Sequence, residues 1–271
     1  MLRWARSCAF VFFFTSLSAA PFVSANTIFV DESFTIGTSA TAPLPSGWKA
    51  DKQSTVRTVG TYSAAVTATE QRAGTGMATN ATNGIYNYAA GQPTSNLERA
   101  VGFISSSTAT KSGNLYVNFT TGAQTSTSLD ISYDVEKYRN GDNAAGFSFQ
   151  MYYSLDGTIW TSAGADFLTS FVRDGNTSGF SPPPGVTVPV SKTLNVPVAA
   201  NTPFYLAWNY SVTSGTATAN AQALGIDNVK ISGIAPAAVP LPSTASAGGA
   251  IMLGLGAVRT VRRRLFAARP I

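Results

Sequence analysis

Hydrophobic and polar residues alternate in short runs through most of the chain between Asn26 and Gly233, and turn-forming residues separate these runs. The run from Ser128 to Glu136 is the clearest, because every second residue is apolar and the others are Ser, Asp or Glu. A two-residue period places apolar side chains on one face of a strand and polar side chains on the other. Long helical patterns are missing from this region, so the sequence predicts an all-β sandwich or barrel.

The same alternation predicts individual strands and the connections between them. Segments 74–96 and 167–184 are rich in turn residues and are expected to be long connections, and 43–48 is expected to be a loop that places the indole of Trp48. The predicted strands are 27–34, 62–69, 85–88, 99–104, 114–120, 128–136, 146–154, 186–196, 204–210 and 223–231.

Local chemistry refines three of these strands. Asp156-Gly157 lies between two aromatic-rich runs and indicates a hairpin with a type I′ turn, which needs positive φ at both central positions. Pro189 cannot donate to a ladder, so its strand is expected at a sheet edge or a bulge. The apolar phase of the last strand switches between Ile226 and Val229, which indicates a bulge near Asp227 or burial of the strand on both sides. With no internal repeat, one domain over 26–234 and a linker at 235–238 are the simplest organisation.

The amino-acid composition excludes several catalytic mechanisms. The chain has no histidine, and its only cysteine, Cys8, lies in a segment expected to be removed. Ser-His-Asp and Cys-His catalysis and the usual zinc sites are therefore excluded. A mature chain without cysteine also has no disulfide, so its stability must come from a hydrophobic core.

The positive net charge of +5 belongs to the two ends of the chain. Seven of the 18 basic residues are Arg3, Arg6, Arg259, Arg262, Arg263, Arg264 and Arg269. The remainder is 11 basic against 13 acidic residues, so the domain carries 11 − 13 = −2. A basic patch is the usual mark of a nucleic-acid partner, and its absence from the domain composition argues against such a partner.

The first 25 residues have the features of a secretory signal peptide. Arg3 and Arg6 precede the apolar run 8–17, and small residues follow up to Ala25. A run this short favours a cleaved signal over a membrane anchor, which needs about 20 residues. We expect cleavage between Ala25 and Asn26 and export through the Sec machinery.

The C-terminal segment 239–271 combines a proline-rich start, an apolar run and an arginine cluster. The apolar run 245–258 makes a helix of about 21 Å, shorter than the roughly 30 Å hydrocarbon core, although arginine side chains can extend it by snorkelling. Arginines that follow such a helix hold its end in the cytoplasm, which places the domain outside the inner membrane. The segment could be a plain membrane anchor.

This segment also resembles the PEP-CTERM sorting signal, which an exosortase recognises and cuts. The resemblance is carried by Val239, Pro240, Pro242, Ser243, Thr244, Arg262, Arg263 and Arg264. Leu241 stands where the family usually has Glu, and 265–271 continues past the arginine cluster. The resemblance implies a transient inner-membrane intermediate and then delivery to the cell surface or the extracellular polysaccharide matrix.

The domain itself is similar to secreted bacterial jelly-roll modules of the carbohydrate-binding or adhesin type. The motifs that carry this similarity are Leu44-Pro-Ser-Gly-Trp48, Glu98-Arg-Ala-Val-Gly102, Tyr133-Asp-Val-Glu-Lys-Tyr-Arg139, Tyr153-Ser-Leu-Asp-Gly-Thr-Ile-Trp160 and Leu224-Gly-Ile-Asp-Asn-Val229. The similarity implies a single antiparallel jelly-roll-type β-sandwich, flanked by an N-terminal signal helix and a short C-terminal hydrophobic helix.

Three sets of residues are candidates for chemistry. Trp48 and Trp160 lie near predicted loops and are the candidate platforms for stacking on sugar rings, whereas Trp208 lies on an apolar stripe and is expected in the core. Jelly-roll modules often hold a structural calcium between the first and last strands, and carboxylates are ligands that calcium prefers. Asp31, Glu32 and Asp227 are the candidates for such a site.

Asp134 and Glu136 form the remaining set. Residues i and i+2 of a strand share one face, about 6.5–7 Å apart, a spacing that could suit the paired carboxylates of a glycosidase. The family resemblance instead implies a structural polar pair between Glu136 and Arg139. We therefore expect a non-catalytic surface or matrix protein that binds polysaccharide, with a glycan hydrolase and a purely structural matrix protein as alternatives.

Overall fold

The structure is a computed structural model that describes residues 26–74, 76–88, 99–123 and 125–234. The predicted signal segment, linker and sorting segment, with their two helices, lie outside these residues. Within the described ranges, no helix has the length and hydropathy needed to cross a lipid bilayer.

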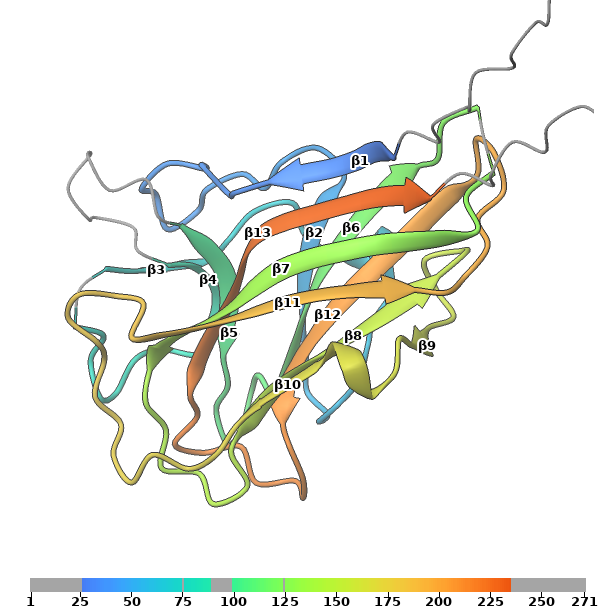
Figure 1. Cartoon of the computed structure of the whole chain (residues 1–271). Coiled ribbons are helices and arrows are strands. Elements are labelled where there is room, and N and C mark those ends of the chain that lie inside the picture. The colour runs from blue at the N-terminus through green and yellow to red at the C-terminus, as the bar shows by residue number, and fades with distance from the viewer. Residues whose placement is uncertain (1–25, 75, 89–98, 124, 235–271) are drawn as a thin grey trace, which may run out of the picture. The chain divides into compact units, whose positions relative to one another are not determined.

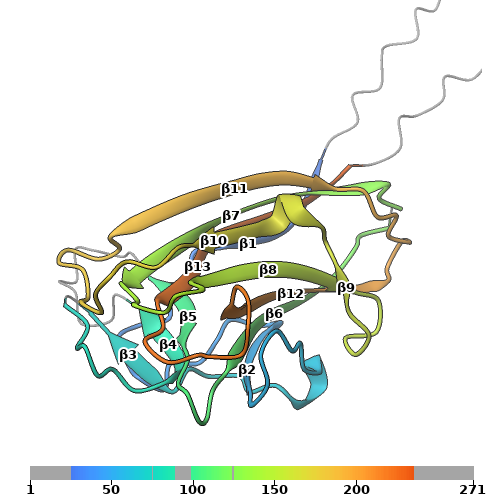
Figure 2. The ribbon, with the colours of Figure 1, turned by 90° about the horizontal axis from the view of Figure 1, so that it is seen from below.

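The strands form two sheets that pack face to face (Figures 1 and 2). The seven-stranded sheet has the order β11 (Val186–Leu194), β7 (Ser128–Arg139), β13 (Ala223–Ile234), β5 (Ala100–Ile104), β4 (Gly84–Tyr88), β3 (Gln71–Ala73), and β1 (Thr27–Glu32) also pairs with β13. The six-stranded sheet has the order β10 (Leu168–Phe171), β8 (Phe147–Ser154), β12 (Pro203–Val212), β6 (Ser112–Thr120), β2 (Trp48–Gln53), and β9 (Thr161–Ser162) pairs with β8.

The chain crosses between the sheets repeatedly, as in a jelly roll. It passes from β6 to β7 and back to β8, and then from β10 to β11, β12 and β13. All pairs are antiparallel except β3 with β4, which is parallel. The predicted all-β, jelly-roll-type sandwich is therefore confirmed. Two short 3-10 turns, η1 (Tyr62–Ala64) and η2 (Ala165–Phe167), lie in its connections.

Alternating residues of both sheets form the core, because a sandwich buries one face of every central strand. Leu129, Ile131, Tyr133 and Val135 of β7 are buried, as the alternation predicts. Across the interface, Trp208 of β12 is also fully buried and meets the Tyr133 ring edge-on at 5.5 Å. The prediction that Trp208 belongs to the core is confirmed.

Two irregular features lie where the sequence predicts them. β11 is an edge strand that pairs with β7, and Pro189 lies in its middle, where a missing N–H does least harm. The pairing of β13 with β7 shifts register between Asp227 and Lys230, and Asn228 has φ of +50°. Both the edge strand and the bulge near Asp227 are confirmed.

Other local predictions are wrong. The segment 62–69 is not a strand, because it runs over the six-stranded sheet as η1 and two isolated bridges. β2 was not predicted, and only its first residue, Trp48, falls in a segment predicted as loop, whereas β10 lies inside 167–184, which was predicted as a long loop. The turn at Asp156-Gly157 is not type I′, since only Gly157 has positive φ, at +70°. The Asp156 carboxylate accepts the N–H groups of Thr158 and Ile159 and so selects a longer turn.

Candidate functional site

The outer face of the six-stranded sheet carries side chains in rows that cross the strands. Register aligns Tyr152 of β8, Ala207 of β12, Tyr116 of β6 and Lys49 of β2, and we call this the aromatic row. The neighbouring row is polar and consists of Gln150, Asn209, Asn114 and Asp51 on the same four strands, and we call it the amide row. Facing side chains of adjacent strands lie about 4.5–5.5 Å apart, so each row is continuous.

Trp160 completes the aromatic row from outside the sheet. Its indole ring lies 5.3 Å from the Tyr116 ring, and it packs on a small cluster that contains Ala207. The indole N–H donates to the Gly60 carbonyl at 2.7 Å, which fixes the orientation of the ring. Ala207 leaves room for the indole because its side chain is a single methyl group. Trp160 is therefore half-buried, with part of the ring open to solvent.

Two more tyrosines extend this group. The Tyr62 and Tyr205 rings meet edge-on at 5.1 Å, and the Lys49 ammonium lies 4.7 Å from the centre of the Tyr62 ring. Burial raises the pKa of Tyr62, and the nearby Tyr205 raises it further, so the phenol stays neutral at physiological pH. The half-buried rings of Tyr62, Tyr152, Trp160 and Tyr205 form a surface that we call the Trp160 face.

A strap, residues 54–61, covers the amide row. The Thr58 carbonyl accepts from the side-chain amides of Asn114 at 3.0 Å and Asn209 at 2.9 Å. The backbone N–H of Arg57 donates to Ser211 Oγ at 2.9 Å. Polar residues on an outer sheet face are normally exposed, but Asn114 and Asn209 are buried here, and the Thr58 carbonyl of the strap satisfies their amides.

The amide row ends in the half-buried carboxylate of Asp51. Asn209 donates to Asn114 Oδ1 at 2.6 Å, and Asn114 donates to Asp51 Oδ1 at 2.6 Å. The Tyr116 hydroxyl donates to Asp51 Oδ2 at 2.9 Å. Desolvation raises the pKa of Asp51, although three side-chain hydrogen bonds act in the opposite direction. Burial, together with the charge of Asp51, also raises the pKa of Tyr116. This network holds the base of the aromatic row rigid.

The two predicted platforms differ in the structure. Trp160 lies at the centre of the Trp160 face. Trp48, by contrast, is 3% exposed and stacks on Trp208 at 5.7 Å inside the core. A buried indole offers no face to a sugar, so the prediction of Trp48 as a platform is wrong. The apolar register of β2 turns Trp48 inward, and β2 was not predicted.

Sequence reasoning considered tyrosines only as a group and did not single out Tyr62, Tyr152 and Tyr205. Tyr152 and Tyr205 occupy outward positions in two recognised strands, and this alternation was the available signal. A second pair of aromatic residues that was not predicted belongs to the seven-stranded sheet. The Tyr88 and Tyr138 rings stack 4.3 Å apart, in nearly parallel planes. Both of these rings are buried. Gly225 leaves room for them, because a Cβ there would lie 3.0 Å from the Tyr88 ring.

Asp134 and Glu136 share one face of the seven-stranded sheet but have different surroundings. Glu136 is 2% exposed and accepts a hydrogen bond from the Tyr138 hydroxyl. Asp134 is half-buried and accepts from the Asn228 amide at 3.0 Å. Arg139 donates to the backbone carbonyls of Ala78, Thr79 and Ala221. These bonds tie the loop that follows β3 to the sheet, a structural role.

The carboxylates of the predicted calcium site lie on two adjacent strands, since β1 pairs with β13. Asp31 is exposed and lies 3.8 Å from the Lys230 ammonium, and Glu32 accepts the N–H of Phe34 at 2.7 Å. Asp227 is buried and faces Asp134 in register. In the part of the chain that the structure describes, no three acidic, His or Cys side chains cluster closely enough to hold a metal. The calcium site stays a prediction.

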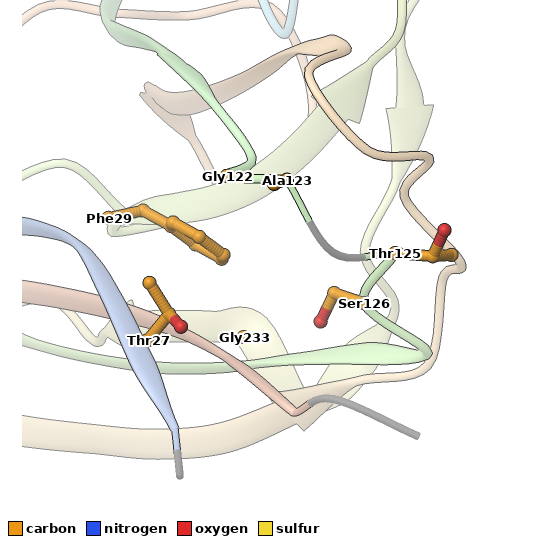
Figure 3. Close-up of a pocket in the computed structure, with 7 residues that line it drawn as sticks. All are labelled: Thr27, Phe29, Gly122, Ala123, Thr125, Ser126 and Gly233. Carbon is orange, nitrogen blue, oxygen red and sulfur yellow. The ribbon is translucent and has the colours of Figure 1, made fainter. Parts of the chain in front are cut away.

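A separate pocket of about 270 Å³ opens between β1 and the loop that follows β6 (Figure 3). Gly233 is required there, because a Cβ would lie 2.5 Å from the Phe29 ring. The lining residues are Thr27, Phe29, Gly122, Ala123, Thr125, Ser126 and Gly233. None of these is charged, and only Phe29 is aromatic, so the pocket offers less recognition chemistry than the Trp160 face.

Comparisons with known proteins identify no family. Neither a scan against family models nor a search of curated proteins finds a match. Among solved structures, the chain is similar to the CBM22-1 xylan-binding domain of Paenibacillus barcinonensis Xyn10C, with 11% identity and a TM-score of 0.39 over 80% of this chain and 100% of that one. The K3 adhesin domain of Lys-gingipain from Porphyromonas gingivalis has 14% identity and a TM-score of 0.39 over 76% and 99%.

A third similar structure is TmCBM61 in complex with β-1,4-galactotriose. It has 10% identity and a TM-score of 0.34, over 74% of this chain and 97% of that one. Likeness at this level does not extend beyond architecture. The strand pairing described above establishes the β-sandwich independently.

Proposed function

We propose that the sandwich is a non-catalytic module that binds polysaccharide through the Trp160 face. The observation that carries this proposal is the set of four half-buried aromatic rings on the outer face of a sheet. Sugar rings have apolar C–H faces that pack on aromatic rings, and binding sites combine such surfaces with a few polar groups. The half-buried polar side chains beside the rings are Lys49, Asn118 and Gln150.

Rigidity supports the same proposal, because a preorganised surface loses little entropy on binding. Trp160 is fixed between the Gly60 carbonyl and the Tyr116 ring. Gln150 donates to the carbonyls of Met151 and Gly164, each at 3.0 Å, which leaves its own oxygen for a ligand hydroxyl. The rings and the amide therefore hold their positions before a ligand arrives.

The proposal includes export and sorting. The protein would leave the cytoplasm through the Sec machinery, pass through an inner-membrane intermediate, and be cut by an exosortase at its PEP-CTERM-like segment. It would then reside at the cell surface or in the extracellular polysaccharide matrix. Mass spectrometry of the mature protein tests this part, because a C-terminus that still carries Arg262, Arg263 and Arg264 would refute the processing.

The binding proposal is tested with the full chain on a glycan array. We expect Trp160→Ala and Tyr152→Ala each to weaken binding at least tenfold, because each removes one ring from the face. Phe180→Ala is the matched control, since Phe180 is also a half-buried aromatic residue but lies in the loop before β11. Melting temperatures report whether each variant is folded.

The outcomes separate the candidate functions. Binding that survives both substitutions in folded protein would place the ligand elsewhere. A failure of the full chain to bind any glycan would favour a structural matrix protein. If the wild type hydrolyses a glycan and Glu136→Gln does not, the glycosidase alternative would be favoured over a structural role for the Glu136 carboxylate.

A further inference from the structure

A short turn at the end of β8 holds two aliphatic side chains in water next to the Trp160 face. Leu155 is 60% exposed and Ile159 is 74% exposed, and they flank the turn that leads to Trp160. Isolated exposed apolar residues are common, but a pair beside an aromatic surface enlarges one continuous patch. The chemistry of this patch therefore bears on what the Trp160 face binds.

Hydrogen bonds hold the backbone of this turn, so the points from which these side chains project are fixed. Asp156 Oδ1 accepts the N–H groups of Thr158 and Ile159, both at 2.8 Å. Ser154 Oγ accepts the N–H of Gly157 at 2.9 Å. These backbone N–H groups lower the pKa of Asp156, so the carboxylate stays ionised and the bonds persist at neutral pH.

The turn is also fastened to the Trp160 face. The Tyr62 N–H donates to the Gly157 carbonyl at 2.9 Å. Gly157 lies against two residues of the face, since a Cβ there would lie 3.1 Å from the Tyr205 ring and 3.1 Å from the Tyr62 Cβ. Leu155 and Ile159 therefore border the aromatic surface as a fixed rim.

A third aliphatic side chain borders the amide row on the same outer face. Leu168 of β10 is 44% exposed and is the register partner of Gln150. Aliphatic side chains offer apolar contact and no hydrogen bonds, so a sugar hydroxyl placed against them loses its water without compensation. An apolar substituent placed there gains from burial.

We propose, on the basis of the glycan-binding function above, that this rim is a subsite for apolar substituents of the polysaccharide. The ligand class is then a glycan whose hydroxyls are partly replaced by O-acetyl groups or by the methyl groups of deoxy sugars. Burying one methyl group tightens binding by about fourfold in Kd. Contact with two or three such groups should therefore favour the substituted form by about tenfold or more.

The test uses the full chain and matched pairs of polysaccharides. O-acetylated xylan, xanthan, gellan and partly acetylated cellulose are each compared with the same polymer after deacetylation in base, by affinity electrophoresis or calorimetry. We expect at least one backbone to bind, and its acetylated form to bind about tenfold more tightly. Leu155→Ser and Ile159→Ser should remove this preference and leave the affinity for the deacetylated form unchanged.

Ile28→Ser is the matched control, because Ile28 is 53% exposed but lies on β1 of the other sheet. Equal affinity for both forms, with binding still lost in Trp160→Ala, would overturn the subsite and leave the proposed function standing. Absence of binding to every polymer would overturn both. Conversion of a wild-type dimer to a monomer by Ile159→Ser would also overturn the subsite, because the rim would then be a self-association surface.

Discussion

Gly60→Ala tests whether the strap holds the Trp160 face in place. Gly60 lies directly over the Asp51 carboxylate, and an added Cβ would be 2.1 Å from Asp51 Oδ2 and 2.5 Å from Gln53 Nε2. Ordinary contacts begin near 3.4 Å, so the strap or the hydrogen-bonded Asp51 and Gln53 side chains must move by more than an ångström in total. The φ of Gly60 is not positive, so the effect is steric and not a matter of backbone strain.

The cost follows from the bonds that the strap makes. A shift of this size breaks the 2.7 Å bond from Trp160 to the Gly60 carbonyl and strains the bonds to the Thr58 carbonyl from Asn114 and Asn209. Each lost hydrogen bond costs about 1 kcal/mol, so we expect a loss of about 2–3 kcal/mol in the free energy of unfolding. Glycan binding should weaken too, because Trp160 loses its fixed orientation.

Urea unfolding followed by tryptophan fluorescence measures this loss. Gly122→Ala is the matched control, since an added Cβ there has no atom within 4 Å. A glycine replaced without strain usually gains about 0.4–1 kcal/mol from the unfolded state, so the control should be neutral or slightly stabilised. If the stability of Gly60→Ala falls within about 0.5 kcal/mol of wild type, the strap is not held as described.

Three further predictions address other parts of the sandwich. Gly225→Ala should destabilise by about 1–3 kcal/mol in urea unfolding, because its Cβ presses on the Tyr88 ring, and a neutral result would contradict the tight stacking. The folded pKa of Asp51 is raised above 3.8, so its contribution to folding stability is greatest below pH 3.8 and declines as the pH rises through the folded pKa. The melting temperature should therefore change less with pH in Asp51→Asn than in wild type, and equal slopes would refute the assignment. If Asp31 and Asp227 hold calcium, a chelator should lower the melting temperature of wild type and not of Asp227→Asn, and an unshifted wild type would dismiss the site.

The strands that were predicted well are those whose alternation has a single cause. In β7 and β12 one face of each strand meets the other sheet, so period-two patterning at 128–136 and 204–210 survives in the sequence. β2 was missed because its outward residues include Lys49 and Asp51, which are typical of a loop. The setting of Asp51 depends on hydrogen bonds from Asn114 and Tyr116 of β6, which are distant in sequence and leave no local pattern.

The Trp160 face shows a similar limit. Trp160 could be proposed from its position next to a turn, but its partners come from β6, β8, β12 and η1. Cross-strand rows depend on the register between strands that are far apart in sequence. This register cannot be inferred from the pattern within any single strand. For the same reason Trp48, which has an equally loop-like context, could not be distinguished from a platform.

The pairing of β1 with β13, with Thr27 opposite Gly233, has a mechanical consequence. β13 is held along its length by β7 on one side and by β5 and β1 on the other. A pull on the end of β13 along its own axis loads these ladders in shear, so many hydrogen bonds must yield together instead of opening one after another. If the end of β13 is tethered and a polymer is bound to the domain, tension between them would enter the sheet through the strand that is paired on both sides.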